Sequence, residues 1–211
     1  MLKNIVAFAL APLPVPPWAN GSERGLHLRW RWGWLRGWAA RPSWRVRELL
    51  GGPRIRVGRR FSLLGRLKAH GPGEVIFGDD VTVDALTTPF THSPAARIEI
   101  GDGSYVNGTR FGCASLIRIG QRAILADARI IDTDFHSLHV SERHDPRAKA
   151  LTAPIVVEEN VWVGAGAAVL KGVHIGKDAV VGFGSVVVHD VEAGSVVAGN
   201  PARPVARVPG T

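Results

Sequence analysis

Residues 154–191 read PIVVEENVWVGAGAAVLKGVHIGKDAVVGFGSVVVHDV, and an aliphatic side chain returns at every sixth position of this stretch. A period of six fits neither the turn of an α-helix nor the alternation of a simple strand. It predicts short strands joined at tight corners, with the aliphatic residues pointing inward and glycine where a side chain would crowd a corner. The sixfold positions are Val157, Val163, Val169, Ile175, Val181 and Val187, followed four residues later by Val161, Ala167, Val173, Ala179, Ser185 and Val191, and the corner glycines include Gly164, Gly176 and Gly182.

The same rhythm appears earlier in the chain with slips, for example at Ile119, Leu125 and Ile131. The longest break separates Ile131 from Val157 and contains a polar stretch, which indicates a loop leaving the coil. Stacked coils complete each other's hydrogen bonds as parallel sheets. The sequence therefore predicts an all-β protein, a three-sided parallel β-helix. Its expected parts are an irregular N-terminal segment at 1–54, the β-helix at 55–205 with a projecting loop at 137–152, and a tail at 206–211.

The first part of the chain carries the positive charge. Residues 1–70 hold 14 Lys and Arg against Glu23 and Glu48, a net charge of +12, whereas the rest of the chain has a net charge of −4. Six of the seven tryptophans lie between positions 18 and 44, where they alternate with arginine. This composition suits an anionic membrane surface, and the open edge of a coil also needs a cover. We expect the segment to do one or the other, and no motif beside it favours nucleic acid.

Other features of the sequence bear on compartment and chemistry. The apolar stretch 4–20 contains four prolines and is too short to span a membrane, and it lacks a clear secretory cleavage pattern. We therefore expect a cytoplasmic protein. The single cysteine, Cys113, cannot form an internal disulfide, and it is expected to be a small buried residue rather than a nucleophile.

Residues 98–205 resemble the hexapeptide-repeat acyltransferases, the left-handed parallel β-helix family that includes galactoside, maltose, nodulation-factor and polysaccharide O-acetyltransferases. The likeness is densest from Pro154 to Val205. It implies a left-handed coil and a homotrimer whose active sites lie between neighbouring subunits. It also implies transfer of an acetyl group from acetyl-CoA to a hydroxyl of a sugar or glycan precursor, in surface polysaccharide or glycolipid assembly, with no bound metal.

In that family a histidine at the end of a coil leads into a projecting loop, and DTDFHSLH at 132–139 fits this pattern with His136 in the histidine's place. The resemblance implies that His136 is the general base, which removes the proton of the acceptor hydroxyl in a ternary complex. A base with a pKa of about 6.5 is largely unprotonated yet still basic at neutral pH. Asp134 is expected either to orient an acceptor hydroxyl or to shape the turn.

The resemblance also implies roles for residues outside the loop. Asn107 would contact the acceptor sugar. Backbone amides around Ala165 and Phe183 would line the pantetheine arm, and Arg203 would lie near the phosphates of acetyl-CoA. The whole set expected to bind acetyl-CoA is Trp162, Ala165, Phe183, Gly184, Val188, His189 and Arg203.

Two departures and two alternatives accompany this interpretation. The family often has Thr-Lys where this chain has Val188 and His189, and alanine where this chain has Phe183. These departures bear on the affinity for acetyl-CoA. One alternative is a gamma-type carbonic anhydrase, a zinc enzyme on the same kind of coil with a histidine pair spaced like His139 and His144. In that family the ligands lie on regular coils, whereas this pair lies in the inserted loop. The other alternative is a non-catalytic scaffold at a membrane surface.

Overall fold

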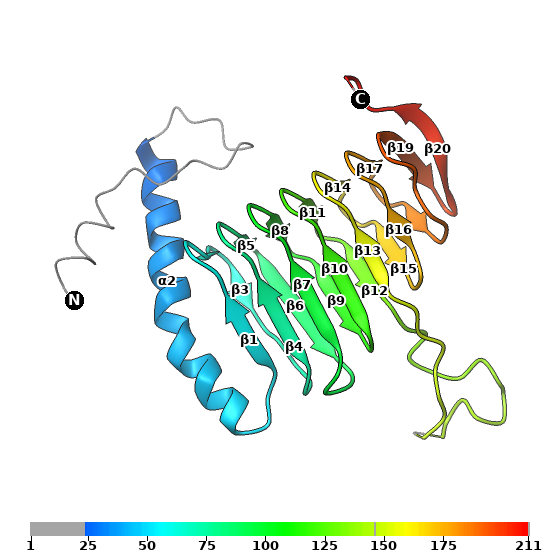
Figure 1. Ribbon diagram of the computed structural model, residues 1–211, viewed down its shortest axis with the longest axis horizontal. Coiled ribbons are helices and arrows are strands. Elements are labelled where there is room, and N and C mark those ends of the chain that lie inside the picture. Colours follow the sequence, from blue (N-terminus) through cyan, green and yellow to red (C-terminus); the bar gives the residue numbers. More distant parts are fainter. Residues whose placement is uncertain (1–23, 146, 211) are drawn as a thin grey trace.

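The computed structural model describes residues 24–145 and 147–210, and in this part of the chain three sheets and one helix form an elongated prism (Figure 1). The proline-rich stretch 4–20 and the start of the tryptophan-rich segment lie outside the described residues. Among the residues described, no helix combines the length and the apolarity that crossing a membrane requires.

Each of the first six coils contributes one strand to each of the three sheets, so these strands are one coil apart in sequence, and the second sheet has two further strands. The first sheet contains β1 (Arg54–Val57), β4 (Glu74–Phe77), β7 (Arg97–Ile100), β10 (Leu116–Ile119), β13 (Ile155–Val157) and β16 (His174–Ile175). The second contains β2 (Ser62–Leu63), β5 (Thr82–Asp84), β8 (Tyr105–Asn107), β11 (Ile124–Ala126), β14 (Trp162–Val163), β17 (Val180–Val181), β19 (Ser195–Gly199) and β20 (Ala202–Arg207). The third contains β3 (Arg66–Leu67), β6 (Leu86–Thr91), β9 (Arg110–Cys113), β12 (Arg129–Ile131), β15 (Ala168–Leu170) and β18 (Val186–Val187).

The predicted left-handed parallel β-helix is confirmed. Neighbouring strands pair in parallel, for example β10 with β13 and β11 with β14. All six residues of the sixfold series are at most 1% exposed, and the residues four positions later are buried as well. A Cβ added at Gly176 would lie 2.5 Å from the backbone of Ala193, so the corner has no room for a side chain.

Ile131 is a correction to the predicted rhythm, because the inward residue of β12 is Ile130. Ile130 is fully buried, whereas Ile131 faces outward and is half-buried. The inward residues Leu125 and Ile130 are five positions apart, but Val163 and Val169, one coil further, are six apart. The corner between the second and third sheets is therefore one residue shorter in the coil that precedes the loop.

The projecting loop runs from the end of β12 to the start of β13, over residues 132–154 (Figure 1). Its neck is closed by hydrogen bonds between the two passing segments: Ala153 N–H donates to the carbonyl of Asp132 and Asp134 N–H to that of Leu151, both at 3.0 Å. The coil thus continues after the loop in the same register.

The described part of the N-terminal segment is a helix, α2 (Arg24–Leu49), and not the irregular chain that was expected. Its buried residues Trp30, Gly33, Gly37 and Trp44 recur at helical spacing, a pattern that the density of arginine and tryptophan obscures. The helix lies along the first coil, where Arg36 donates to the carbonyls of Leu64 and Gly65 at 2.6 and 2.8 Å. It therefore covers the open edge of β2 and binds carbonyls that no earlier coil can reach.

The other end of the coil also departs from the expected boundaries. β20 turns back and pairs antiparallel with β19, so the chain ends the prism with a hairpin and not with a further coil. The boundary predicted at 205 falls inside this hairpin, which extends to Arg207.

Candidate active site

His136 lies at the rim of the prism, where the coil gives way to the loop. The backbone N–H of His136 donates to the backbone carbonyl of Asp134 at 2.8 Å, which tightens the turn. The residue is exposed. The ring is therefore accessible to a ligand, and the role of His136 as a base stays a prediction.

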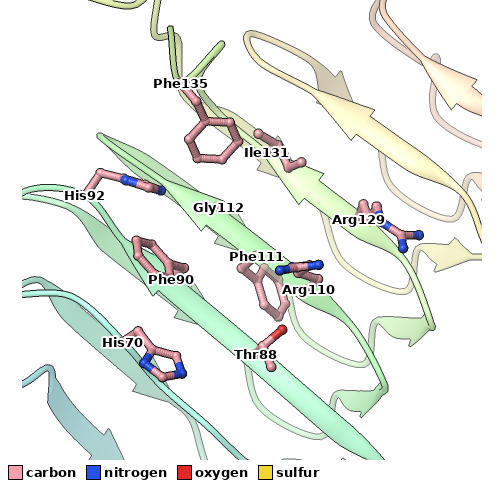
Figure 2. A pocket seen from close by; sticks show the side chains of 10 residues that line it. All are labelled: His70, Thr88, Phe90, His92, Arg110, Phe111, Gly112, Arg129, Ile131 and Phe135. Atoms are coloured by element: carbon pink, nitrogen blue, oxygen red, sulfur yellow. The ribbon is translucent and has the colours of Figure 1, made fainter. Parts of the chain in front are cut away.

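Phe135 fixes the backbone directly before His136. Its φ of +61° lies in the left-handed region, which aromatic residues rarely adopt. Gly112 of β9 faces outward, and a Cβ there would lie 2.6 Å from the far end of the Phe135 ring. The ring also contacts His92, with the two centroids 4.8 Å apart (Figure 2). The missing side chain at Gly112 thus leaves a notch, and Phe135 fills it and holds the neighbouring segment against the sheet.

Asp134 is bound by Lys171, which directly follows β15. Lys171 Nζ lies 2.6 Å from Asp134 Oδ1, so the pair ties the base of the loop to the next coil. Asp134 Oδ2 is buried and has no hydrogen-bond partner among the described residues. An unpaired buried oxygen costs about 1–3 kcal/mol. The contact with Lys171 gives Asp134 a structural role, and its contact with an acceptor stays a prediction.

Two adjoining hollows form a groove on the outer face of the third sheet, and they share Thr88, Arg110 and Arg129. One hollow, of about 510 Å³, reaches Phe135, and the other, of about 650 Å³, reaches Asn107 at the end of β8. The Asn107 end lies over the shortened corner. We call this surface the third-sheet groove, and Figure 2 shows its Phe135 end.

Four rings line the Phe135 end of the third-sheet groove. Centroids are 5.9 Å apart for His70 and Phe90, 4.5 Å for Phe90 and His92, and 4.8 Å for His92 and Phe135. The removal of water from around the His92 ring lowers its pKa, although Asp132 acts in the opposite direction. His92 is therefore neutral at pH 7, and the four rings form a shelf on which a ligand with a flat or ring-shaped apolar face could lie.

The residues expected to line the pantetheine arm share the corner between the second and third sheets. Gly184 N–H donates to the carbonyl of Ala165 at 2.9 Å, which places the two residues on neighbouring coils. Trp162 is 49% exposed and Phe183 83% exposed, so both rings are available for contact. This part of the set is close together in the structure, and its contact with acetyl-CoA stays a prediction.

The other residues expected to bind acetyl-CoA lie near the C-terminal hairpin. His189 and Arg203 line a separate hollow of about 310 Å³. Val188 follows β18 on the outer face and is 38% exposed. The structure therefore brings His189 and Arg203 together, but in one chain their hollow does not share a lining residue with the third-sheet groove.

Cys113 is fully buried, and burial together with the nearby carboxylate of Asp132 raises its pKa to about 12. The thiol is therefore protonated at neutral pH and is a poor nucleophile. Asp132 accepts the backbone N–H of Ala114 and Ser115 at 2.7 and 2.8 Å, which stabilises the corner after β9.

The alternative of a zinc site is not supported by the geometry of the loop. His139 and His144 are both exposed. Over residues 24–145 and 147–210, no three His, Cys, Asp or Glu side chains gather in a way that could hold a metal ion.

Sequence reasoning missed Gly112, Phe135 and Lys171, and it missed the paired arginines Arg110 and Arg129. The arginines are 19 residues apart, as are the inward residues of the same coils, so the coil length alone could have placed them side by side. Nothing periodic marks Phe135 or Lys171, because their contacts depend on the path of the loop.

Comparison with known proteins agrees with the repeat. Residues 154–189 match the bacterial transferase hexapeptide (six repeats) family. A protein of Schizosaccharomyces pombe named as an acetyltransferase is 29% identical over 163 residues, which cover 71% of this chain and 78% of that protein.

Solved structures show the same fold. A hexapeptide-repeat acetyltransferase from Vibrio cholerae, crystallised with acetyl-CoA, is similar with a TM-score of 0.54 and 20% identity, over 90% of this chain and 92% of that one. A polysialic acid O-acetyltransferase is similar with a TM-score of 0.60 and 22% identity, over 75% and 77% of the two chains. At these identities the likeness concerns the fold. The resemblance seen in the sequence is confirmed: residues 154–189 carry the hexapeptide repeat of bacterial transferases, and the chain is similar to acetyltransferases built on this β-helix.

Proposed function

We propose that the protein transfers an acetyl group from acetyl-CoA to a hydroxyl of a sugar or glycan precursor, with His136 as the general base. The acetyltransferase relative and the Vibrio cholerae structure with acetyl-CoA support the donor, and the polysialic acid O-acetyltransferase supports a sugar acceptor. The observation that carries the proposal is the exposed residue His136, which directly follows Phe135 at one end of a groove whose other end holds Asn107.

The proposed reaction is a direct transfer in a ternary complex. The imidazole of His136 takes the proton of the acceptor hydroxyl as its oxygen attacks the thioester carbonyl of acetyl-CoA. The tetrahedral intermediate then collapses to the acetyl ester, and the C–S bond breaks. The thiolate of CoA leaves and receives the proton from the imidazolium, so His136 returns to its neutral form.

We place the second wall of the site on a neighbouring subunit of a homotrimer. Two features of the single chain support this arrangement. The exposed rings of Trp162 and Phe183 lack a cover, and the hollow of His189 and Arg203 is separate from the third-sheet groove. A neighbour could bring its own corner of the second and third sheets opposite His136.

The decisive experiment follows release of the CoA thiol in the presence of a library of sugars, with mass spectrometry of the acetylated product. Replacement His136→Ala is expected to slow transfer about 10²–10⁴-fold, since the base is lost. His174→Ala is the control, because His174 is another exposed histidine and pairs with Glu158 at 3.0 Å on the first sheet, away from the groove. A His136→Ala enzyme as fast as wild type would disprove the assignment of the base.

We also propose that a cytoplasmic protein of this kind touches an anionic membrane surface through the outer face of α2. This face carries an exposed apolar stripe at helical spacing, opposite the face that packs on the first coil. The residues of the stripe are 46–86% exposed, and they are Leu28, Trp32, Leu35, Val46 and Leu49, with Trp38 beside them.

Charge favours lipid over a second copy of the helix. Arg31, Arg45 and Arg47 flank the stripe and form no ion pair among the residues the structure describes, while the acidic residue of the helix, Glu48, is bound by Arg56 at 2.7 Å. Two such helices would repel each other, whereas each basic residue near an anionic bilayer contributes about 1 kcal/mol.

Vesicle flotation tests this contact. The wild type is expected to bind vesicles containing phosphatidylserine and not pure phosphatidylcholine, with binding weakened by salt. The double variant Trp32→Ala/Trp38→Ala should bind about tenfold more weakly or worse, because apolar burial is lost. Trp162→Ala removes an exposed tryptophan outside α2 and should bind as the wild type does. Equal binding to both kinds of vesicle would contradict the proposal.

A further inference from the structure

Two arginines stand directly opposite each other on the outer face of the third sheet. Arg110 of β9 and Arg129 of β12 are register partners on neighbouring coils, and both side chains are exposed (Figure 2). Strands in a sheet lie about 4.8 Å apart, so the two side chains leave the backbone close together. Like charges directly opposite each other destabilise a sheet.

The first sheet of the same protein avoids such pairs. There Arg118 of β10 binds Glu99 of β7 at 2.8 Å, and Arg97 lies 3.7 Å from Glu74 of β4. Arginines on that face therefore have a carboxylate on the same or the next coil. The pair on the third sheet needs a reason other than the stability of the coil.

No described carboxylate neutralises the pair. Asp127 lines the Asn107 end of the third-sheet groove, but among the described residues it forms no ion pair with the guanidinium of Arg110 or of Arg129. Asp132 is bound to two backbone N–H groups of the next corner, and Asp134 is bound to Lys171. Arg110 and Arg129 therefore present their donors to the hollow.

The shelf of rings adjoins these arginines and includes Phe135, the residue directly before His136. Thr88, Arg110 and Arg129 form one row of outward residues, and Phe90, Gly112 and Ile131 form the next row, over which Phe135 lies. The hollow of about 510 Å³ spans both rows and has room for a sugar ring. Guanidinium groups on one side and aromatic faces on the other suit a ring that carries an anionic substituent.

We propose that the third-sheet groove binds an acidic acceptor, a sugar that carries a carboxylate or a phosphate group, with Arg110 and Arg129 holding the anion and the rings of Phe90, His92 and Phe135 holding the sugar. The orientation of a hydroxyl toward His136 rests on the proposed function. The binding of the acidic sugar does not, because it requires no transfer of an acetyl group.

Calorimetric titration at low salt tests the proposal with three probes: glucuronic acid, glucose 6-phosphate and neutral glucose. A charged probe is expected to bind about tenfold tighter than glucose or better. The tighter of the two charged probes identifies the anionic group. Each of the variants Arg110→Gln and Arg129→Gln should lose most of this advantage, while Arg118→Gln on the first sheet should keep it.

The outcomes separate this inference from the proposed function. Charged probes that bind no tighter than glucose would overturn the acidic acceptor and leave acetyl transfer to a neutral sugar intact. If the arginine variants raise KM for acetyl-CoA and leave that of the acceptor unchanged, the pair serves the phosphates of the donor and the inference fails. Tight binding of a charged probe with no acetyl transfer would sustain the inference and remove the proposed function.

Discussion

The coils after the loop, from β13 to β18, and the two coils before it, from β7 to β12, follow the same sixfold plan, but they differ at the corner between the second and third sheets. In the later coils six positions separate the inward residues across that corner, as between Val163 and Val169. Before the loop the distance is five positions, as between Leu125 and Ile130. A hollow of about 650 Å³ lies over the shortened corners.

This difference separates scaffold from site. Strict repetition buries a continuous column of aliphatic side chains, which makes the later coils a rigid support. Where the repeat loses a residue, outward positions come into a new alignment, and the arginine pair and the notch at Gly112 lie there. The irregular coils thus provide the groove, and the regular coils keep it in place.

Neighbouring isoleucines give the sharpest test of the shortened corner. The sixfold rhythm treats Ile131 as the core residue, but the structure buries Ile130 completely and leaves Ile131 on the outer face. We expect Ile130→Ala to lower the free energy of unfolding by about 2–5 kcal/mol, the usual cost of removing a fully buried isoleucine, and Ile131→Ala to lower it by much less. Urea denaturation of both variants measures the difference.

The two isoleucine variants are a matched pair, because residue type, substitution and strand are the same in both. A difference in their stability therefore reports which of the two side chains points into the core. If Ile131→Ala proved the more damaging change, the uninterrupted sixfold register would be correct and the shortened corner wrong.

The sequence predicted the scaffold well because its signal is repeated. Val157 and its successors at sixfold spacing are all buried, and the corner glycines Gly164 and Gly176 stand where a Cβ would clash with the backbone of the next coil. Each coil adds the same local pattern, so one misplaced residue changes little. The position of His136 at the end of a coil could also be read from the motif around it.

The contacts of the groove could not be predicted in the same way, because each depends on a single event in the chain. Phe135 reaches Gly112 across 22 intervening residues only because the loop turns back, and a left-handed aromatic residue leaves no mark in the sequence pattern. Helix α2 was missed for another reason. It is apolar on two opposite faces, so its amphipathic signal is weak even though its inner face recurs at helical spacing.

Alanine substitution at two glycines, Gly176 in a regular coil and Gly112 beside the groove, is expected to affect stability in the first case and activity in the second. A Cβ at Gly176, in a regular coil, would meet the backbone of Ala193 at 2.5 Å, and backbone in a filled corner cannot move aside. We expect Gly176→Ala to cost about 1–3 kcal/mol of stability, as overpacking does.

A Cβ at Gly112 would meet only the far end of the Phe135 ring, which is exposed on its other side and can swing away. Gly112→Ala should therefore unfold close to the wild type, while the proposed acetyl transfer should slow, because displacement of Phe135 moves the adjoining His136. Thermal unfolding and the CoA-release assay, run on both variants, check this. A Gly112→Ala protein with full activity would mean that Phe135 does not position His136, the proposed base.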